Sequence, residues 1–132
     1  MEKIMTIDNR QVKFKSTGAF LLRYKAQFHR DAIKDIYRLQ GAVEVVEETI
    51  VDDETGEERI VKKNIIKDIE ALDLEVFYNL VWTLAKTADP TILAPMEWLD
   101  TFSEFPLYDI LPELMHMIFS SFNTTTESKK KI

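Results

Sequence analysis

The side chains that could perform acid–base or metal chemistry are few. His29 and His116 belong to different predicted helices, and neither has the HxxxH or HExxH spacing that brings two imidazoles to one metal ion. Two carboxylate pairs could exchange protons with a substrate, but polar residues flank both and no apolar pocket is marked around them: Asp68 with Glu70, and Glu97 with Asp100. We therefore expect no enzyme activity, no metal and no cofactor.

Phosphate-binding and thiolate chemistry are also missing from the sequence. Gly18, Gly41 and Gly56 are the only glycines, and none opens the GxxxxGK or GxGxxG pattern of a nucleotide-binding loop. The chain has no cysteine, so it forms neither a disulfide nor a thiolate metal site. The acidic residues around Asp52 lack the DxDxDG spacing of a calcium loop.

Length and composition indicate one compact domain. The chain has 132 residues, of which 45% are hydrophobic and 30% charged. No stretch approaches the roughly 20 apolar residues that span a bilayer, and the N-terminus has no continuous apolar segment typical of a signal peptide. We expect one domain over residues 1–122, a flexible tail over 123–132, a cytoplasmic location and no membrane partner.

The charge is unevenly distributed along the chain. The net charge is −6, but residues 1–40 hold nine Lys/Arg against four Asp/Glu, a net charge of +5, which leaves −11 for the rest. A basic helix face could meet phosphates through five side chains: Arg23, Lys25, Arg30, Lys34 and Arg38. The isoelectric point near 5 argues against a nucleic-acid partner, because the whole molecule would repel a polyanion.

The first 41 residues predict a β-hairpin and two helices. Apolar residues alternate on both sides of a polar turn at residues 8–10, which indicates a hairpin over residues 1–15. An apolar stripe over residues 19–28 predicts the first helix, after a capping cluster at residues 16–18. Asp31 has the side chain of an N-cap for a second helix that should end by Gly41.

Residues 43–63 support two interpretations. Valine, isoleucine and threonine favour strands, so the segment could form a second hairpin, residues 43–51 with 59–63, across a turn that contains Gly56. The dense acidic cluster favours a mobile loop instead, since so charged a segment buries little apolar surface to offset its loss of conformational entropy.

The remaining chain predicts three helical regions. The strongest periodicity covers residues 68–88, with Asp73 as a cap; a short helix follows over 96–101, and a last one over 107–122 that Pro112 should kink or divide. The expected fold is therefore mainly α with a small β component, an N-terminal β-hairpin followed by a compact bundle of about four to five helices.

Apolar side chains in the last third are the candidates for function. Methionine and aromatic residues are typical of adaptable binding faces as well as of cores, and residues 115–122 are apolar nearly all round. Plain core packing is the alternative role, above all for Trp98 and Leu111. The candidate partner-binding residues are Trp98, Phe102, Phe105, Leu111, Met115, Ile118, Phe119 and Phe122.

Four stretches together resemble the tail assembly chaperones of long-tailed phages and prophages of Gram-positive bacteria. They are TIDNRQVKFKSTG, RYKAQFHRDAIKDIYRL, FYNLVWTLAKTADPTI and MEWLDTFSEFPLYDILPELM, and they cover most of residues 4–116. The most specific element is a helix ending in AKTADPTI followed by EWLDTF. The chain departs from the resemblance where glycine is expected, at His29 and in the hairpin turn, and in the acidic insert at 44–63.

The resemblance implies a function in assembling phage tails. Such a chaperone binds the tape-measure protein, keeps it soluble, helps recruit tail-tube subunits and is absent from the mature virion, all in the host bacterial cytoplasm. Recognition would be of the helix-in-groove kind. The sequence does not decide whether the chain forms a homo-oligomer. The alternative functions are a small nucleic-acid-binding regulator or a structural tail-completion protein.

Overall fold

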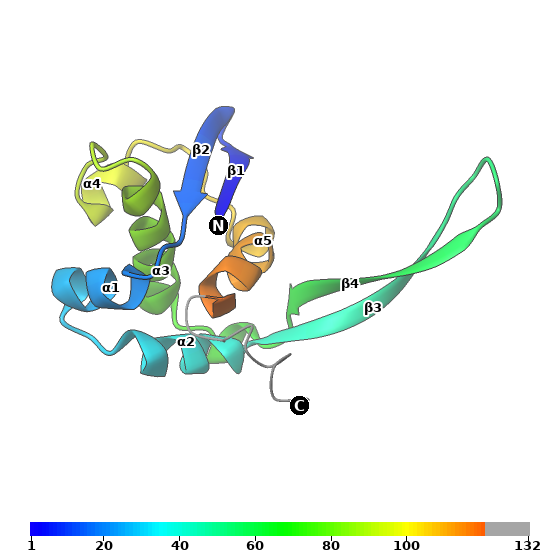
Figure 1. Cartoon of the computed structure of the whole chain (residues 1–132), viewed down its shortest axis with the longest axis horizontal. Helices are drawn as coiled ribbons and strands as arrows, with labels where there is room; N and C mark the ends of the chain where they lie inside the picture. Colours follow the sequence, from blue (N-terminus) through cyan, green and yellow to red (C-terminus); the bar gives the residue numbers. More distant parts are fainter. Residues whose placement is uncertain (121–132) are drawn as a thin grey trace.

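The computed structural model describes residues 1–120, which form two β-hairpins and five α-helices (Figure 1). In chain order the elements are β1 (Glu2–Ile7), β2 (Arg10–Lys15), α1 (Phe20–Phe28), α2 (Ala32–Gln40), β3 (Val43–Val51), β4 (Glu58–Ile66), the 3-10 helix η1 (Ile69–Ala71), α3 (Leu74–Ala88), α4 (Pro95–Leu99) and α5 (Leu107–Ser120).

The predicted N-terminal hairpin is confirmed, and its turn has the geometry that a tight hairpin needs. β1 and β2 pair antiparallel with Ile7 opposite Arg10, which leaves a two-residue turn of Asp8 and Asn9. Both turn residues have positive φ, 53° and 61°, as in the turns whose twist matches that of the flanking strands. Asparagine and aspartate tolerate this conformation better than other non-glycine residues, so glycine is not required here.

Two helices follow the hairpin at the predicted places. The Asp31 side chain accepts hydrogen bonds from the backbone N–H groups of Ile33 and Lys34 at 2.9 and 3.3 Å, so the predicted N-cap of α2 is confirmed. α1 ends at Phe28, and its C-cap His29 adopts a left-handed conformation with φ of 58°. Glycine reaches this conformation most easily, and it is the residue that the resemblance leads us to expect at this position.

The central helix α3 organises the core. It packs against β2, α1, α2, α4 and α5, and Figure 1 shows these elements gathered around it. Asp73 caps its N-terminus by accepting a 3.2 Å hydrogen bond from the Val76 N–H. The helix starts later than predicted, because Asp68 caps the separate 3-10 turn η1 before it. Its fully buried side chains are Val76, Phe77, Leu80, Val81 and Leu84.

The expected fold class, a mainly α helical bundle, is wrong. The described chain is a mixture of α and β structure, with 45% helix and 25% strand, and it has two small antiparallel two-stranded sheets. The first hairpin is part of the core, because Val12 and Phe14 of β2 are buried where β2 packs on α3. The helical periodicity of the sequence does not report this packing of a strand on a helix.

Pro112 does not divide the last helix, which runs through it as α5. Pro112 has no N–H to donate to the Tyr108 carbonyl four residues earlier, so one helical hydrogen bond is missing at this point. The part of the predicted helix beyond residue 120, with Phe122, lies outside the described residues, as does the predicted tail over 123–132.

Residues 43–66 form the second hairpin, here called the arm, which extends away from the helices (Figure 1). Of the two interpretations of this segment, the structure has the hairpin. Its strands are nine residues each and β4 continues to Ile66, three residues beyond the predicted end. The turn is closed by the Asp52 carboxylate, which accepts from two backbone N–H groups, and by Gly56 at φ 74°.

Candidate protein-binding surfaces

The predicted contact residues at the end of α4 and after it form a buried aromatic cluster. Trp98 and Phe102 are buried, and Phe105 is half-buried. The ring centroids of these three residues lie 5.1 to 5.7 Å apart in edge-on arrangements, which are favourable for aromatic pairs. Phe105 also contacts Phe77 of α3. The cluster therefore connects the segment 98–105 to the core.

The turn of the first hairpin closes this cluster from outside. The Arg10 guanidinium lies 3.8 Å from the centre of the Phe102 ring and donates hydrogen bonds to the backbone oxygen and hydroxyl of Thr101. The Asp8 carboxylate accepts from both the N–H and the hydroxyl of Ser103, and these bonds hold its pKa below the usual range. Trp98 and Phe102 are thus not available to a partner in this conformation.

The predicted contact residues of α5 lie on its inner face. Leu111, Met115 and Ile118 are fully buried, and Met117 is buried as well. Phe119 is half-buried against the core, and Phe122 lies outside the described residues. Of the eight predicted contact residues, Phe105 and Phe119 are the two in the described part of the chain that are half-buried and not buried.

The opposite side of α5 forms the floor of an open groove of about 910 Å³. Residues 3–6 of β1 make one wall and residues 62–66 of β4 make the other. Successive side chains of a strand point to opposite faces of its hairpin. Because each wall consists of consecutive residues, the groove runs along the edges of β1 and β4. The floor residues are Tyr108, Asp109, Pro112, Glu113 and His116.

Both walls of the groove form polar contacts with the same turn of α5. Lys3 of β1 forms an ion pair with Glu113 at 2.8 Å, and the Asn64 amide of β4 donates to the Pro112 carbonyl at 3.4 Å. The two apolar side chains that project most are Ile4, 56% exposed, and Tyr108, 61% exposed. The groove therefore combines accessible apolar side chains with paired charges and unpaired strand edges.

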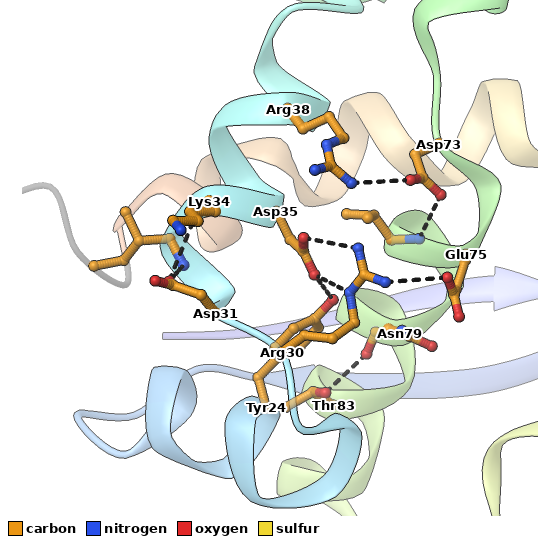
Figure 2. A network of polar contacts seen from close by, with 12 residues as sticks. Tyr24, Arg30, Asp31, Lys34, Asp35, Arg38, Asp73, Glu75, Asn79 and Thr83 are labelled. Carbon is orange, nitrogen blue, oxygen red and sulfur yellow. Dashed lines mark hydrogen bonds and ion pairs between the residues drawn. The ribbon is translucent and has the colours of Figure 1, made fainter.

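A polar cluster at the junction of α1, α2 and α3 is the principal group of buried titratable side chains (Figure 2). Asp35 is buried and accepts hydrogen bonds from the Tyr24 hydroxyl at 2.6 Å and from the Arg30 guanidinium at 2.7 and 3.0 Å. Arg30 also contacts Glu75 of α3 at 3.3 Å. This cluster joins the loop between α1 and α2 to both neighbouring helices.

The electrostatics of this cluster fit a structural role. Burial opposes the charge of Asp35, but the hydrogen bonds from Arg30 and Tyr24 outweigh it and hold the pKa of the carboxyl below its usual range. Burial and the bond to Asp35 raise the pKa of the Tyr24 hydroxyl. The charged side chains of Asp35, Arg30 and Glu75 are paired with one another within the cluster.

The floor of the groove has a periodic signal in the sequence, separate from the apolar stripe of α5. Tyr108, Pro112 and His116 recur every four residues, on the side of the helix opposite the buried stripe. Their importance depends on β1 and β4, which are more than 40 residues away in the chain. Periodicity within one helix could not reveal this arrangement.

Within residues 1–120 none of the helices has the length and apolar character needed to cross a membrane. No three or more His, Asp or Glu side chains in this range are arranged to hold a metal ion.

Comparisons with known proteins identify no relative of the chain. No protein-family model, curated protein or solved structure matches the sequence or its fold.

Proposed function

We propose that the protein is a tail assembly chaperone, which binds the tape-measure protein in the host bacterial cytoplasm, keeps it soluble and helps recruit tail-tube subunits. It performs no reaction of its own and leaves before the virion is complete. The sequence resemblance suggests this function. The observation that carries its binding mode is the open groove between β1, β4 and α5.

The groove has the properties of a protein-binding site more than those of a small-molecule pocket. It is shallow and open, and three separate elements form it. Ile4 and Tyr108 supply exposed apolar contacts, while Met5, Ile65 and Ile66 supply half-buried ones. An amphipathic segment of the client lays its apolar face along α5, as in helix-in-groove recognition. The contact residues are therefore on the outer side of α5 and not on its buried stripe.

The test is co-expression with the tape-measure protein, with the soluble fraction of the client as the measurement. The wild-type chain should raise this fraction, and a variant with Ile4→Asp and Tyr108→Asp should lose most of the effect, because two carboxylates would be desolvated in the contact. Both side chains are exposed, so the variant should fold normally.

The control is Met96→Asp, which places a carboxylate at an exposed apolar residue outside the groove. This control should protect the client as well as the wild-type chain does. An unchanged soluble fraction with the wild-type chain would refute the chaperone function. Equal protection by the groove variant would refute the groove as the binding site.

A further inference from the structure

One face of the arm carries three apolar side chains that no other part of the described chain covers. The register of β3 and β4 places Val45, Val51 and Ile60 on the same face. The polar residues of this face are Glu47, Thr49, Glu58, Lys62 and Asn64. The three apolar side chains are 62%, 52% and 66% exposed. A two-stranded hairpin alone is marginally stable in water, so burial of this face by a partner would stabilise the arm.

The arm is also strongly acidic. Residues 43–66 hold eight Asp/Glu against three Lys/Arg, a net charge of −5. The only ion pair of the arm among residues 1–120 joins Lys63 to Glu48 at 3.0 Å. Five carboxylates around the turn therefore have no basic partner in the described chain: Asp52, Asp53, Glu54, Glu57 and Glu58. The partner of the arm should be basic and should offer apolar surface.

The chain itself carries a surface with these two properties. Between α1 and α2 lies a hollow of about 330 Å³, lined by Leu21, Leu22, Ala32 and Ile33 with Lys25 and Asp31. Leu22 is 73% exposed. Lys25 lines the hollow, and Lys34 directly follows its lining residue Ile33 in the sequence. Both lysines are exposed, and neither has an ion pair in the described residues.

An arm cannot reach the hollow of its own chain. Figure 1 shows α1 at one end of the long axis and the tip of the arm at the other. We propose that the arm of one copy docks on the α1–α2 hollow of a second copy, with Val45, Val51 and Ile60 against Leu22 and Ile33 and the carboxylates of the tip against the basic side chains.

The contact joins two different surfaces, so it is head-to-tail. Each copy then still offers one arm and one hollow, and the contact repeats until a ring closes or a chain grows. The six residue pairs from Val46–Lys63 to Val51–Glu58 extend the arm by about 20 Å, since a strand rises about 3.3 Å per residue. This length is sufficient to cover two short helices. The contact does not depend on the identity of the client.

The first measurement is the mass of the purified full chain by sedimentation velocity over a range of concentrations. The wild-type protein should form species heavier than the 15.4 kDa monomer, and their fraction should fall as salt is added because the opposite charges are screened. A wild-type chain that stays monomeric up to its solubility limit would refute the proposal, and the arm would then be a site for a different basic protein.

Charge reversal tests which surfaces meet. An arm variant with Glu57→Lys and Glu58→Lys, and a hollow variant with Lys25→Glu and Lys34→Glu, should each associate about tenfold more weakly or not at all. Mixing the two variants should restore association, because each reversed surface then meets its complement on the other chain. Failure of the mixture to associate would contradict the pairing of arm and hollow.

A matched control separates this pairing from a general effect of charge. Lys13→Glu combined with Lys67→Glu changes the net charge as much as the hollow variant does, at exposed positions outside the hollow. This control should associate like the wild-type chain. If it lost association as fully as the hollow variant, net repulsion between copies would explain the data and the proposed contact would be excluded.

Discussion

The arm and the rest of the described chain, here called the body (residues 1–42 and 67–120, packed around α3), are stabilised by different interactions. In the body, α3 is surrounded by β2 and four helices, and nine of its 15 residues are buried. In the arm, Val43 is the only buried residue of the two strands. The body is thus a hydrophobic core, whereas the arm is held by its own ladder, its turn and its attachment at Asn64.

This difference separates stability from recognition. A buried apolar side chain contributes to the free energy of unfolding, while an exposed one contributes mainly when a partner covers it. We therefore expect substitutions in the body to change stability and substitutions in the arm to change association.

The largest effect should come from Phe77→Ala in α3. Phe77 is fully buried and contacts the rings of Tyr78 and Phe105, so its removal leaves a cavity in the core. The free energy of unfolding should fall by about 3 to 5 kcal/mol, measured by urea denaturation. Ile60→Ala in the arm is the matched control and should change it by less than about 0.5 kcal/mol. Equal losses would contradict the division between body and arm.

The second effect concerns Asp35, which joins α1, α2 and the loop between them. Asp35→Asn keeps the shape of the side chain but removes the charge that pairs with Arg30. The free energy of unfolding at neutral pH should therefore fall by about 2 to 3 kcal/mol. This loss is smaller than for a fully buried ion pair because Arg30 is partly exposed to solvent. The Tyr24 hydroxyl should lose its charged acceptor as well.

The dependence on pH provides the internal control for Asp35. Its pKa is lowered in the folded state, so its contribution is fully present above the unfolded value near 3.9 and is lost as the pH falls through the folded value. The stability difference between the wild-type chain and Asp35→Asn should therefore be constant above about pH 5 and shrink below about pH 4. A difference that stayed constant in acid would show that packing, not charge, explains the loss.

The local features of the body could be predicted from the sequence, because the residues that determine them are close together in the chain. Asp31 and Asp73 identified helix starts, and the polar turn at residues 8–10 identified the first hairpin. The fold class could not be predicted in this way. Residues 43–66 had both strand-forming side chains and the charge of a loop, and only the continuous pairing of β3 with β4 decides between them.

The burial of most predicted contact residues could not be read from the sequence, for a related reason. Periodicity showed which side of α5 is apolar, but not what covers that side, and Leu111, Met115 and Ile118 proved to be core. Phe102 is covered in part by Arg10, which is about 90 residues away in the chain. Contacts of such long sequence separation, like those that form the groove, leave no pattern within a single segment.

The smallest effect on stability should come from removing most of the arm. Val46 and Lys63 are directly opposite in the register, so residues 47–62 can be replaced by Asn-Gly, which favours a two-residue hairpin turn. The truncation keeps Val43 and Asn64, which attach the arm to the body, so the free energy of unfolding should change by less than about 1 kcal/mol.

Denaturation must be measured at low protein concentration, because association would add stability to the wild-type chain alone. At high concentration the truncated chain should remain a monomer and the wild-type chain should not. A loss of several kcal/mol at low concentration would mean that the arm supports the core, and stability and recognition would then not be separate in this molecule.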